Sequence, residues 1–263
     1  MNILDEIVAY KKKEVEKRKS KKPVATLEML PLFSSPAYSL KRFLMDVNLT
    51  GIIAEFKRKS PSKGIINDTA HVIPVTYAYT SNGASGLSIL TDEHFFGGSL
   101  DDLITARINE LPILRKEFII DEYQIIESKA YGADVILLIA AILTPEQVKE
   151  FTLTAHGLGL EVLLEIHDEA ELGHINERTD IVGVNNRNLK TFSVDLEQSV
   201  HLSHHIPKEK IKISESGIHS IKDIQYLKSF GFNGFLIGEN FMKQPDPGLA
   251  FMQFVAQLNE VEL

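Results

Sequence analysis

The sequence predicts an α/β fold, a single (β/α)8 TIM barrel with an N-terminal helical extension, and two observations point to it. Short apolar runs recur along the chain after residue 50. Amphipathic stretches lie between these runs, a pattern typical of parallel strands joined by helical crossovers. Eight such units in a chain of 263 residues fit a closed barrel, whose usual size is about 250 residues. A doubly wound open sheet is the alternative, but it usually has about five or six strands.

The expected elements follow in order. Residues 2–20 predict a helix, because apolar side chains recur on one face and Lys and Glu fill the rest. Three prolines, Pro23, Pro31 and Pro36, then indicate an irregular segment. The expected strands are Gly51–Ala54, Gly86–Leu90, Pro112–Leu114, Val135–Ile139, Glu161–Leu164, Ile181–Val184, Ile211–Ile213 and Phe235–Ile237. The clearest helices between them are Asp121–Tyr131, Pro145–Leu158, His167–Ile175 and Ile221–Phe230. We therefore expect one domain over residues 1–263, with the extension at 1–48 and the barrel at 49–263.

Composition and charge exclude several classes of function. The formal net charge of −8 argues against a protein that binds nucleic acids or membrane surfaces. The basic run at residues 11–22 is interrupted by Glu14 and Glu16, so a solvated helix face explains it. The chain has no cysteine, which excludes disulfides, thiolate metal sites and a cysteine nucleophile. It also shows no apolar run long enough to span a membrane and no signal peptide, so we expect a cytoplasmic protein.

Polar and ionisable residues follow most of the expected strands at their C-terminal ends. Catalytic residues of barrels lie at this end. On the first strand, a carboxylate and an ammonium two residues apart point to the same side, because side chains alternate along a strand. We expect one shared site formed by Glu55 and Lys57 after the first strand, Lys116 after the third, Glu165 after the fifth, Asn185 and Arg187 after the sixth, and Glu215 after the seventh.

Loops after the last two strands predict a phosphate site. Ser216-Gly217 and Gly238 each precede an expected helix start. Backbone N–H groups at a helix N-terminus bind phosphate, and glycine lets the backbone approach the ligand closely. The loop at 58–67, which contains the Ser60-Pro61-Ser62 turn, is expected to be mobile and to close over the substrate.

Four histidines lie near possible ligands or catalytic residues, but their sequence context predicts no metal or catalytic site. His201, His204 and His205 have a helical spacing that could bind a metal, but no carboxylate motif accompanies them, so we expect no metal site. His167 follows Glu165 closely, and we expect it to begin the next helix. Burial would raise the pKa of Glu165 and nearby lysines would lower it, and the sequence leaves open which effect prevails.

Several stretches resemble one enzyme family, the indole-3-glycerol phosphate synthases of tryptophan biosynthesis. The two most specific are the runs from Ile53 to Gly64 (IAEFKRKSPSKG) and from Gly183 to Leu189 (GVNNRNL). Others are Ile3–Lys12, Leu90–Leu100, Leu114–Ile119, Leu164–Glu169, Ile213–Ile218 and Leu236–Glu239. The resemblance therefore extends over nearly the whole chain.

The resemblance implies a carboxy-lyase that acts on 1-(2-carboxyphenylamino)-1-deoxyribulose 5-phosphate. Such an enzyme closes the indole ring with loss of carbon dioxide and water, and it needs no metal or organic cofactor. Its partner is this phosphorylated small molecule. We expect a monomer that contacts other tryptophan-pathway enzymes transiently.

The family's site residues carry over onto matching positions of this chain. Lys116 looks like the general acid that protonates the sugar carbonyl, and Glu165 looks like the carboxylate that moves protons during dehydration. Lys57 looks like a lysine near the carboxylate and phosphate end of the substrate, with a second acid role, and Glu55 would orient these groups. The expected substrate-binding residues are Ser60, Phe96, Asn185, Arg187, Glu215 and Ser216, and the expected phosphate-binding residues are Lys57, Gly217, Gly238 and Glu239.

Position 239 departs from the family pattern. Glu239 stands where some members have Ser or Thr. We expect its side chain to turn away from the phosphate and its backbone N–H to bind it.

Two other functions are alternatives. An isomerase of the phosphoribosylanthranilate isomerase type uses a cysteine base, and this chain has no cysteine. A barrel that serves only as a scaffold would have no reason to gather Glu55, Lys57, Lys116 and Glu165, because charges in a cavity are costly.

Overall fold

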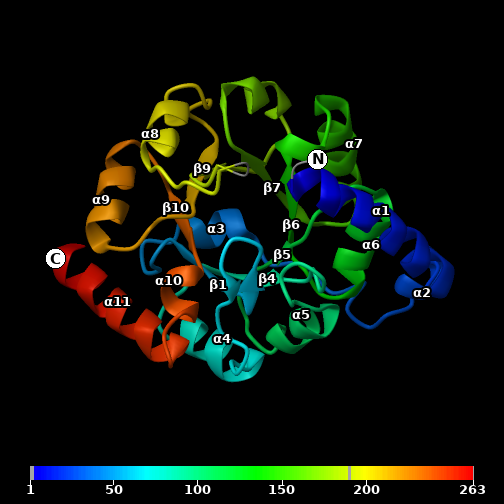
Figure 1. Cartoon of the computed structure of the whole chain (residues 1–263), viewed down its shortest axis with the longest axis horizontal. Helices are drawn as coiled ribbons and strands as arrows, with labels where there is room; N and C mark the ends of the chain where they lie inside the picture. The colour runs from blue at the N-terminus through cyan, green and yellow to red at the C-terminus, as the bar shows by residue number, and fades with distance from the viewer. Residues whose placement is uncertain (1–2, 189–190, 263) are drawn as a thin grey trace.

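The computed structural model describes residues 3–188 and 191–262, so Asn2 of the expected first helix and Leu189 of the second motif lie outside the described residues. Within these ranges a closed barrel of parallel strands forms the centre of the molecule, in the order β1-β10-β9-β8-β7-β6-β5-β4 (Figure 1). The strands are β1 (Ile52–Phe56), β4 (Gly86–Leu90), β5 (Ile113–Lys116), β6 (Val135–Ile139), β7 (Glu161–Ile166), β8 (Ile181–Asn185), β9 (Ile211–Glu215) and β10 (Gly234–Ile237). This confirms the predicted (β/α)8 barrel and excludes the open sheet.

Several strands run further than their apolar residues predicted. β1, β5, β7, β8 and β9 all continue into the polar residues that we expected in the loops. The strands continue because pairing with the neighbouring strand extends to these residues. Lys116 pairs with Leu90 of β4, and Glu165 pairs with Ile139 of β6. Polar side chains on paired strands are held more rigidly than side chains on loops.

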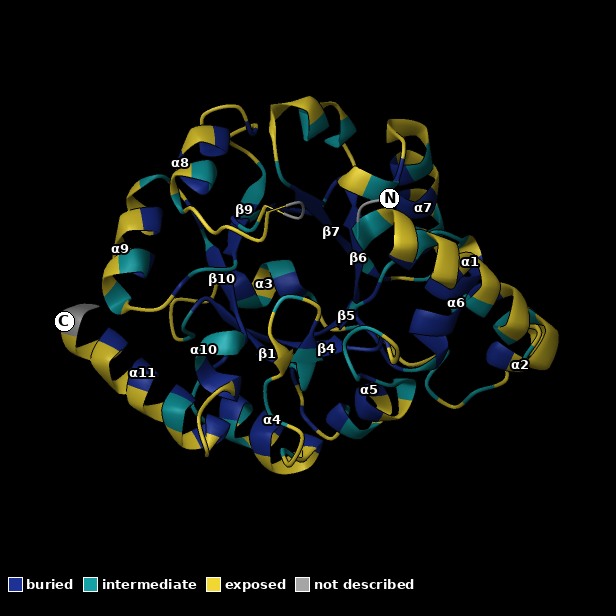
Figure 2. Cartoon of the chain, in the orientation of Figure 1, coloured by how far each residue is buried: buried dark blue, intermediate teal, exposed yellow. Residues whose placement is uncertain are grey.

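Helices surround the barrel, and their inner faces are buried against the strands while their outer faces are exposed (Figure 2). They are α4 (Val72–Ser81), α5 (Leu100–Ala106), α6 (Glu122–Ala130), α7 (Pro145–Gly157), α8 (Glu197–Ser203), α9 (Ile221–Ser229), α10 (Glu239–Met242) and α11 (Pro247–Glu262), with the 3-10 turns η1 (Ala140–Ile142) and η2 (Glu169–His174). Among the described residues, no helix combines the length and apolar character that crossing a membrane requires.

The N-terminal extension contains more helix than its prolines indicated. After α1 (Ile3–Lys21) come α2 (Val24–Leu27) and α3 (Leu40–Leu44). Ser39 caps the N-terminus of α3, because its hydroxyl accepts a hydrogen bond from the backbone N–H of Arg42. Leu40 and Leu44 of α3 are buried and belong to the apolar cluster that fills the barrel interior.

α1 is fixed to the barrel by a buried lysine. Lys11 is only 1% exposed, and its Nζ lies 2.8 Å from Asp92 Oδ2 and 2.9 Å from Glu117 Oε1. Glu14 of the same helix adds a third carboxylate at 2.6 Å. The basic face of α1 is therefore solvated only in part, and one of its lysines is an anchor.

A small hairpin follows β1 in the loop that we expected to be mobile. It consists of β2 (Lys59–Ser60) and β3 (Gly64–Ile65), paired in antiparallel fashion. The loop is tied to α5 by Arg58, whose guanidinium lies 2.6 and 3.0 Å from the two oxygens of Asp102.

Candidate active site

A cavity of about 450 Å³ opens at the C-terminal ends of the strands. The floor of the cavity is charged because side chains alternate along a strand. Each charged residue comes two positions after an apolar residue of the barrel interior, so it points to the same side. These pairs are Ile53 and Glu55, Leu114 and Lys116, Leu163 and Glu165, and Ile213 and Glu215. The uppermost layer of the barrel interior is therefore charged, and it forms the base of the cavity.

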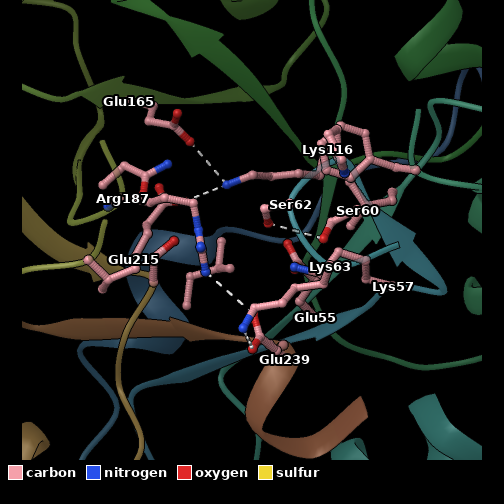
Figure 3. Close-up of a pocket in the computed structure, with 18 of the residues that line it drawn as sticks. Glu55, Lys57, Ser60, Ser62, Lys63, Lys116, Glu165, Arg187, Glu215 and Glu239 are labelled. Carbon is pink, nitrogen blue, oxygen red and sulfur yellow. Dashed lines mark hydrogen bonds and ion pairs between the residues drawn. The ribbon is translucent and has the colours of Figure 1, made fainter. Parts of the chain in front are cut away.

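The cavity brings together all the residues that the sequence nominated. It is lined by Glu55, Lys57, Ser60, Phe96, Lys116, Glu165, Asn185, Arg187, Glu215, Ser216, Gly217, Gly238 and Glu239. Figure 3 shows the charged members pointing into one space from different strands and loops.

Lys116 occupies the centre of this charged layer. Its Nζ lies 3.2 Å from Glu165 Oε2 and donates a second hydrogen bond to Glu215 Oε2 (Figure 3). Burial alone would lower the pKa of Lys116, but the negative charges of Glu215, Glu165 and Glu55 outweigh this effect and raise the pKa. The side chain is therefore a cation at neutral pH.

Glu165 is also held by His167, a contact that we did not predict. His167 Nε2 lies 3.2 Å from Glu165 Oε1, and its backbone N–H donates to Glu171 Oε2 at 2.6 Å. The expectation that His167 begins a helix is wrong, since η2 begins only at Glu169. The spacing of two residues, which also pairs Glu55 with Lys57, was the signal that could have identified it.

The structure shows which effect prevails on the pKa of Glu165, burial or the nearby lysine. Burial would raise this pKa, but the charge of Lys116 and the contacts from His167 and Asn185 lower it. For His167, burial would lower the pKa, but the nearby carboxylates of Glu165 and Glu171, at 3.2 and 3.3 Å, raise it to about 10. Glu165 is therefore a carboxylate at neutral pH.

Glu215 lies in a different environment, although it shares the same lysine. Its Oε1 is buried and has no hydrogen-bond partner among the described residues. Burial raises the pKa of Glu215 to about 7, and the neighbouring charges of Glu165 and Glu55 add to this effect while Lys116 opposes it. Glu215 therefore binds a proton more readily than an ordinary glutamate does.

Glu55 and Lys57 form the pair that their spacing predicted. Lys57 Nζ lies 2.9 Å from Glu55 Oε1. Ser88 of β4 donates a longer hydrogen bond, of 3.4 Å, to Glu55 Oε2. The Glu55 carboxylate thus holds Lys57 at the edge of the charged layer.

One side of the cavity has the features of an anion site. Ser216 and Gly217 follow β9 with φ values of 68° and 77°, in the left-handed region that favours glycine. Gly238 is the N-cap of α10. Backbone N–H groups in such loops and at such helix starts can bind a phosphate.

Two cations lie beside these loops, and Glu239 pairs with both. Its carboxylate lies 3.4 Å from an Arg187 nitrogen and 3.5 Å from Lys63 Nζ. We expected the side chain of Glu239 to turn away from this region, but it lines the cavity and partly neutralises its basic residues (Figure 3).

The remaining wall is apolar and suits an aromatic ring. Phe96 lies beside Phe118, with 5.9 Å between the ring centroids. Leu137 and Ile139 of β6 and Ile7 of α1 also line the cavity. The site therefore combines an apolar wall, a charged floor and an anion-binding rim.

Comparisons with known proteins agree with this geometry. The chain is 49% identical to the indole-3-glycerol phosphate synthase of Bacteroides thetaiotaomicron, over 97% of this chain and 98% of the relative. It is 43% identical to the enzyme of that name from Neisseria meningitidis serogroup B, over 93% and 96% of the two chains.

Solved structures with little sequence similarity share the fold. The α subunit of tryptophan synthase from Legionella pneumophila superposes with a TM-score of 0.60 at 13% identity, covering 84% of this chain and 97% of that one. Thiamine phosphate pyrophosphorylase from Pyrococcus furiosus gives a TM-score of 0.59 at 14% identity, covering 85% and 99%.

The family description of indole-3-glycerol phosphate synthase matches residues 4–254. Together with the relatives above, this match shows that the chain belongs to the indole-3-glycerol phosphate synthase family.

Proposed function

We propose that this protein is a carboxy-lyase that converts 1-(2-carboxyphenylamino)-1-deoxyribulose 5-phosphate into indole-3-glycerol phosphate, carbon dioxide and water. The observation that carries the proposal is the Lys116 ammonium, held between Glu165 and Glu215 in a cavity with an apolar wall and an anion-binding rim. The substrate has three matching parts, which are an aromatic ring, a keto sugar and a phosphate.

Binding begins at the two ends of the cavity. The phosphate lies against the loops of Gly217 and Gly238, where it replaces Glu239 as the partner of Arg187 and Lys63. The aromatic ring lies against the apolar wall. With both ends held, the carbonyl group of the sugar is placed over the charged floor, and this positioning lowers the entropic part of the barrier.

Ring closure uses Lys116 as the general acid. It donates a proton to the carbonyl oxygen while the ring carbon that carries the carboxylate attacks the carbonyl carbon. A carbon–carbon bond forms and the carbonyl becomes a hydroxyl group. The bond to the carboxylate then breaks, carbon dioxide leaves, and the bonding electrons restore the aromatic ring. A positioned acid of this kind contributes about 10²–10⁴-fold to a rate.

Dehydration completes the indole ring and needs an acid and a base. Lys57 donates a proton to the departing hydroxyl, which leaves as water, and Glu55 holds Lys57 in place through their 2.9 Å contact. Glu165 removes a proton from the neighbouring carbon. Its lowered pKa keeps it ionised at neutral pH, so it carries no proton when this step begins.

The test is incubation of the purified protein with the carboxyphenylamino substrate, with formation of indole-3-glycerol phosphate followed by its fluorescence and carbon dioxide release measured in parallel. We expect both products in equal amounts. Lys116→Met should abolish both, while Lys149→Met, which removes an exposed lysine of α7, should retain full activity. Folded wild-type protein that forms neither product would refute the proposal and favour a scaffold.

The oligomeric state of the protein, its location in the cell and its contacts with other enzymes stay predictions. We expect a monomer in the cytoplasm that contacts other tryptophan-pathway enzymes only transiently. Sedimentation velocity over a range of protein concentrations checks the first expectation, since a single species of 29.5 kDa should persist throughout.

A further inference from the structure

Three side chains outside the cavity converge on the surface between two elements that follow neighbouring strands. His201 and His205 lie on α8 and just after it, and Glu169 lies at the start of η2. One donor atom from each of the three residues lies within 4.8 Å of the other two. The sequence indicated the two histidines but not the carboxylate, which is 32 positions from His201 and is brought there by the fold.

His201 and Glu169 form an exposed ion pair in the structure, and the spacing of the three groups also suits a single metal ion. His201 lies in the last turn of α8 and His205 in the turn that follows the helix, and their imidazole rings have centroids 5.5 Å apart. His201 Nε2 also contacts Glu169 Oε1 directly. All three side chains are exposed, so small rotamer changes can bring their donor atoms to bonding distance of one ion.

We propose that Glu169, His201 and His205 form a surface site for a divalent transition-metal ion of the zinc class. Two imidazoles and one carboxylate are donors that Zn²⁺, Ni²⁺ and Cu²⁺ accept, whereas Mg²⁺ and Ca²⁺ prefer oxygen donors alone. Three protein ligands leave a fourth position of a tetrahedral ion for water.

The position of the site gives the bound ion a structural consequence. η2 follows β7, which carries Glu165, and α8 follows β8, which carries Asn185. These two segments are already joined by a hydrogen bond of 2.7 Å from Gln198 Nε2 to the carbonyl oxygen of His167. The contact between His201 Nε2 and Glu169 Oε1 is a second link between them. An ion held by all three residues replaces this exposed ion pair with bonds from both segments to one metal, so it stabilises the folded protein.

The test is calorimetric titration of the full chain, without any histidine tag, with ZnCl2 in a buffer that does not bind metals. We expect one Zn²⁺ per chain at this site and a melting temperature that rises with zinc and falls back with EDTA. His201→Ala, His205→Ala and Glu169→Gln should each weaken binding at least tenfold, because the loss of even an outer-shell partner costs about 10–100-fold.

The matched control is His204→Ala, which removes an exposed histidine of the same segment that packs against Phe230 instead. Its zinc affinity should equal that of the wild type. Zinc binding that survives in both His201→Ala and Glu169→Gln, or that His204→Ala weakens equally, would overturn the proposal, as would a wild-type chain that binds no zinc.

Discussion

Replacement of Gly183 by alanine tests whether the contact between Glu215 and Lys116 matters for turnover without removing either charge. Gly183 lies on β8, and a Cβ atom added there would lie 2.4 Å from Glu215 Oε1 and 3.0 Å from Leu163 Cδ2. Comfortable contacts between such atoms are about 3.5 Å, so the carboxyl group must move by about 1 Å. Gly183 is not in the left-handed region, and its backbone therefore accepts alanine.

The size of the effect follows from the bond that the movement breaks. A hydrogen bond to a charged group contributes about 1.5–3 kcal/mol. Because about 1.4 kcal/mol corresponds to a tenfold change in rate, its loss in the transition state costs about 10–100-fold. A displacement of about 1 Å in an active site can also cost about 100-fold. We therefore expect kcat to fall 10–100-fold, with KM nearly unchanged because the phosphate loops are not touched.

The assay is steady-state indole fluorescence, accompanied by thermal unfolding to show that the variant is folded. Gly157→Ala is the control, since an added Cβ at this end of α7 meets no atom within 4 Å. Its kcat should equal that of the wild type. A folded Gly183→Ala variant with wild-type kcat would refute the reasoning, and Glu215→Gln, which keeps the size of the side chain, gives an independent measure of the same contact.

Three further predictions concern buried charges. Lys116→Met should lower kcat at least about 100-fold while the product indole-3-glycerol phosphate still binds in calorimetry; retained turnover would remove Lys116 from its proposed role. Lys11→Met should lower the free energy of unfolding by about 3–5 kcal/mol in urea titrations, because it leaves the buried Asp92 without its cation and Glu117 with Arg115 alone, at 3.6 Å; an unchanged midpoint would show that the anchor is unimportant. Glu215 should make the fold less stable as the pH rises from about 4.5 to about 7, because its pKa is raised to about 7 in the folded state and the folded protein therefore retains a proton that the unfolded chain releases. Glu215→Gln should remove this slope, by up to about 3 kcal/mol across the interval, and equal slopes in both proteins would contradict the assignment.

The barrel, and the position of its strand-end charged residues around one cavity, could be predicted from the sequence for one physical reason. A parallel barrel buries each strand on both faces, so its strands appear as apolar runs, and their C-terminal ends meet at one rim. Residues such as Lys116 and Arg187 therefore share a cavity although they are far apart in the chain.

Tertiary contacts of single side chains could not be predicted in this way. Lys11 belongs to a helix face that looks solvated, and only the approach of Asp92 and Glu117 makes its burial tolerable. Glu169 likewise has no sequence pattern in common with His201. Their proximity depends on how η2 and α8 pack, which local periodicity does not encode.

The opposite behaviour of the two carboxyl groups at Lys116 is the clearest property that only the geometry decides. Both groups are buried beside the same ammonium. Its charge alone would lower the pKa of each. Glu165 has further partners in His167 and Asn185, whereas Glu215 keeps one oxygen without a partner among the described residues and feels two neighbouring negative charges. One carboxyl group is therefore held ionised, while the other binds a proton more readily than an ordinary glutamate. Two residues of the same type beside one lysine thus differ because their other neighbours differ, and those neighbours come from other strands of the barrel.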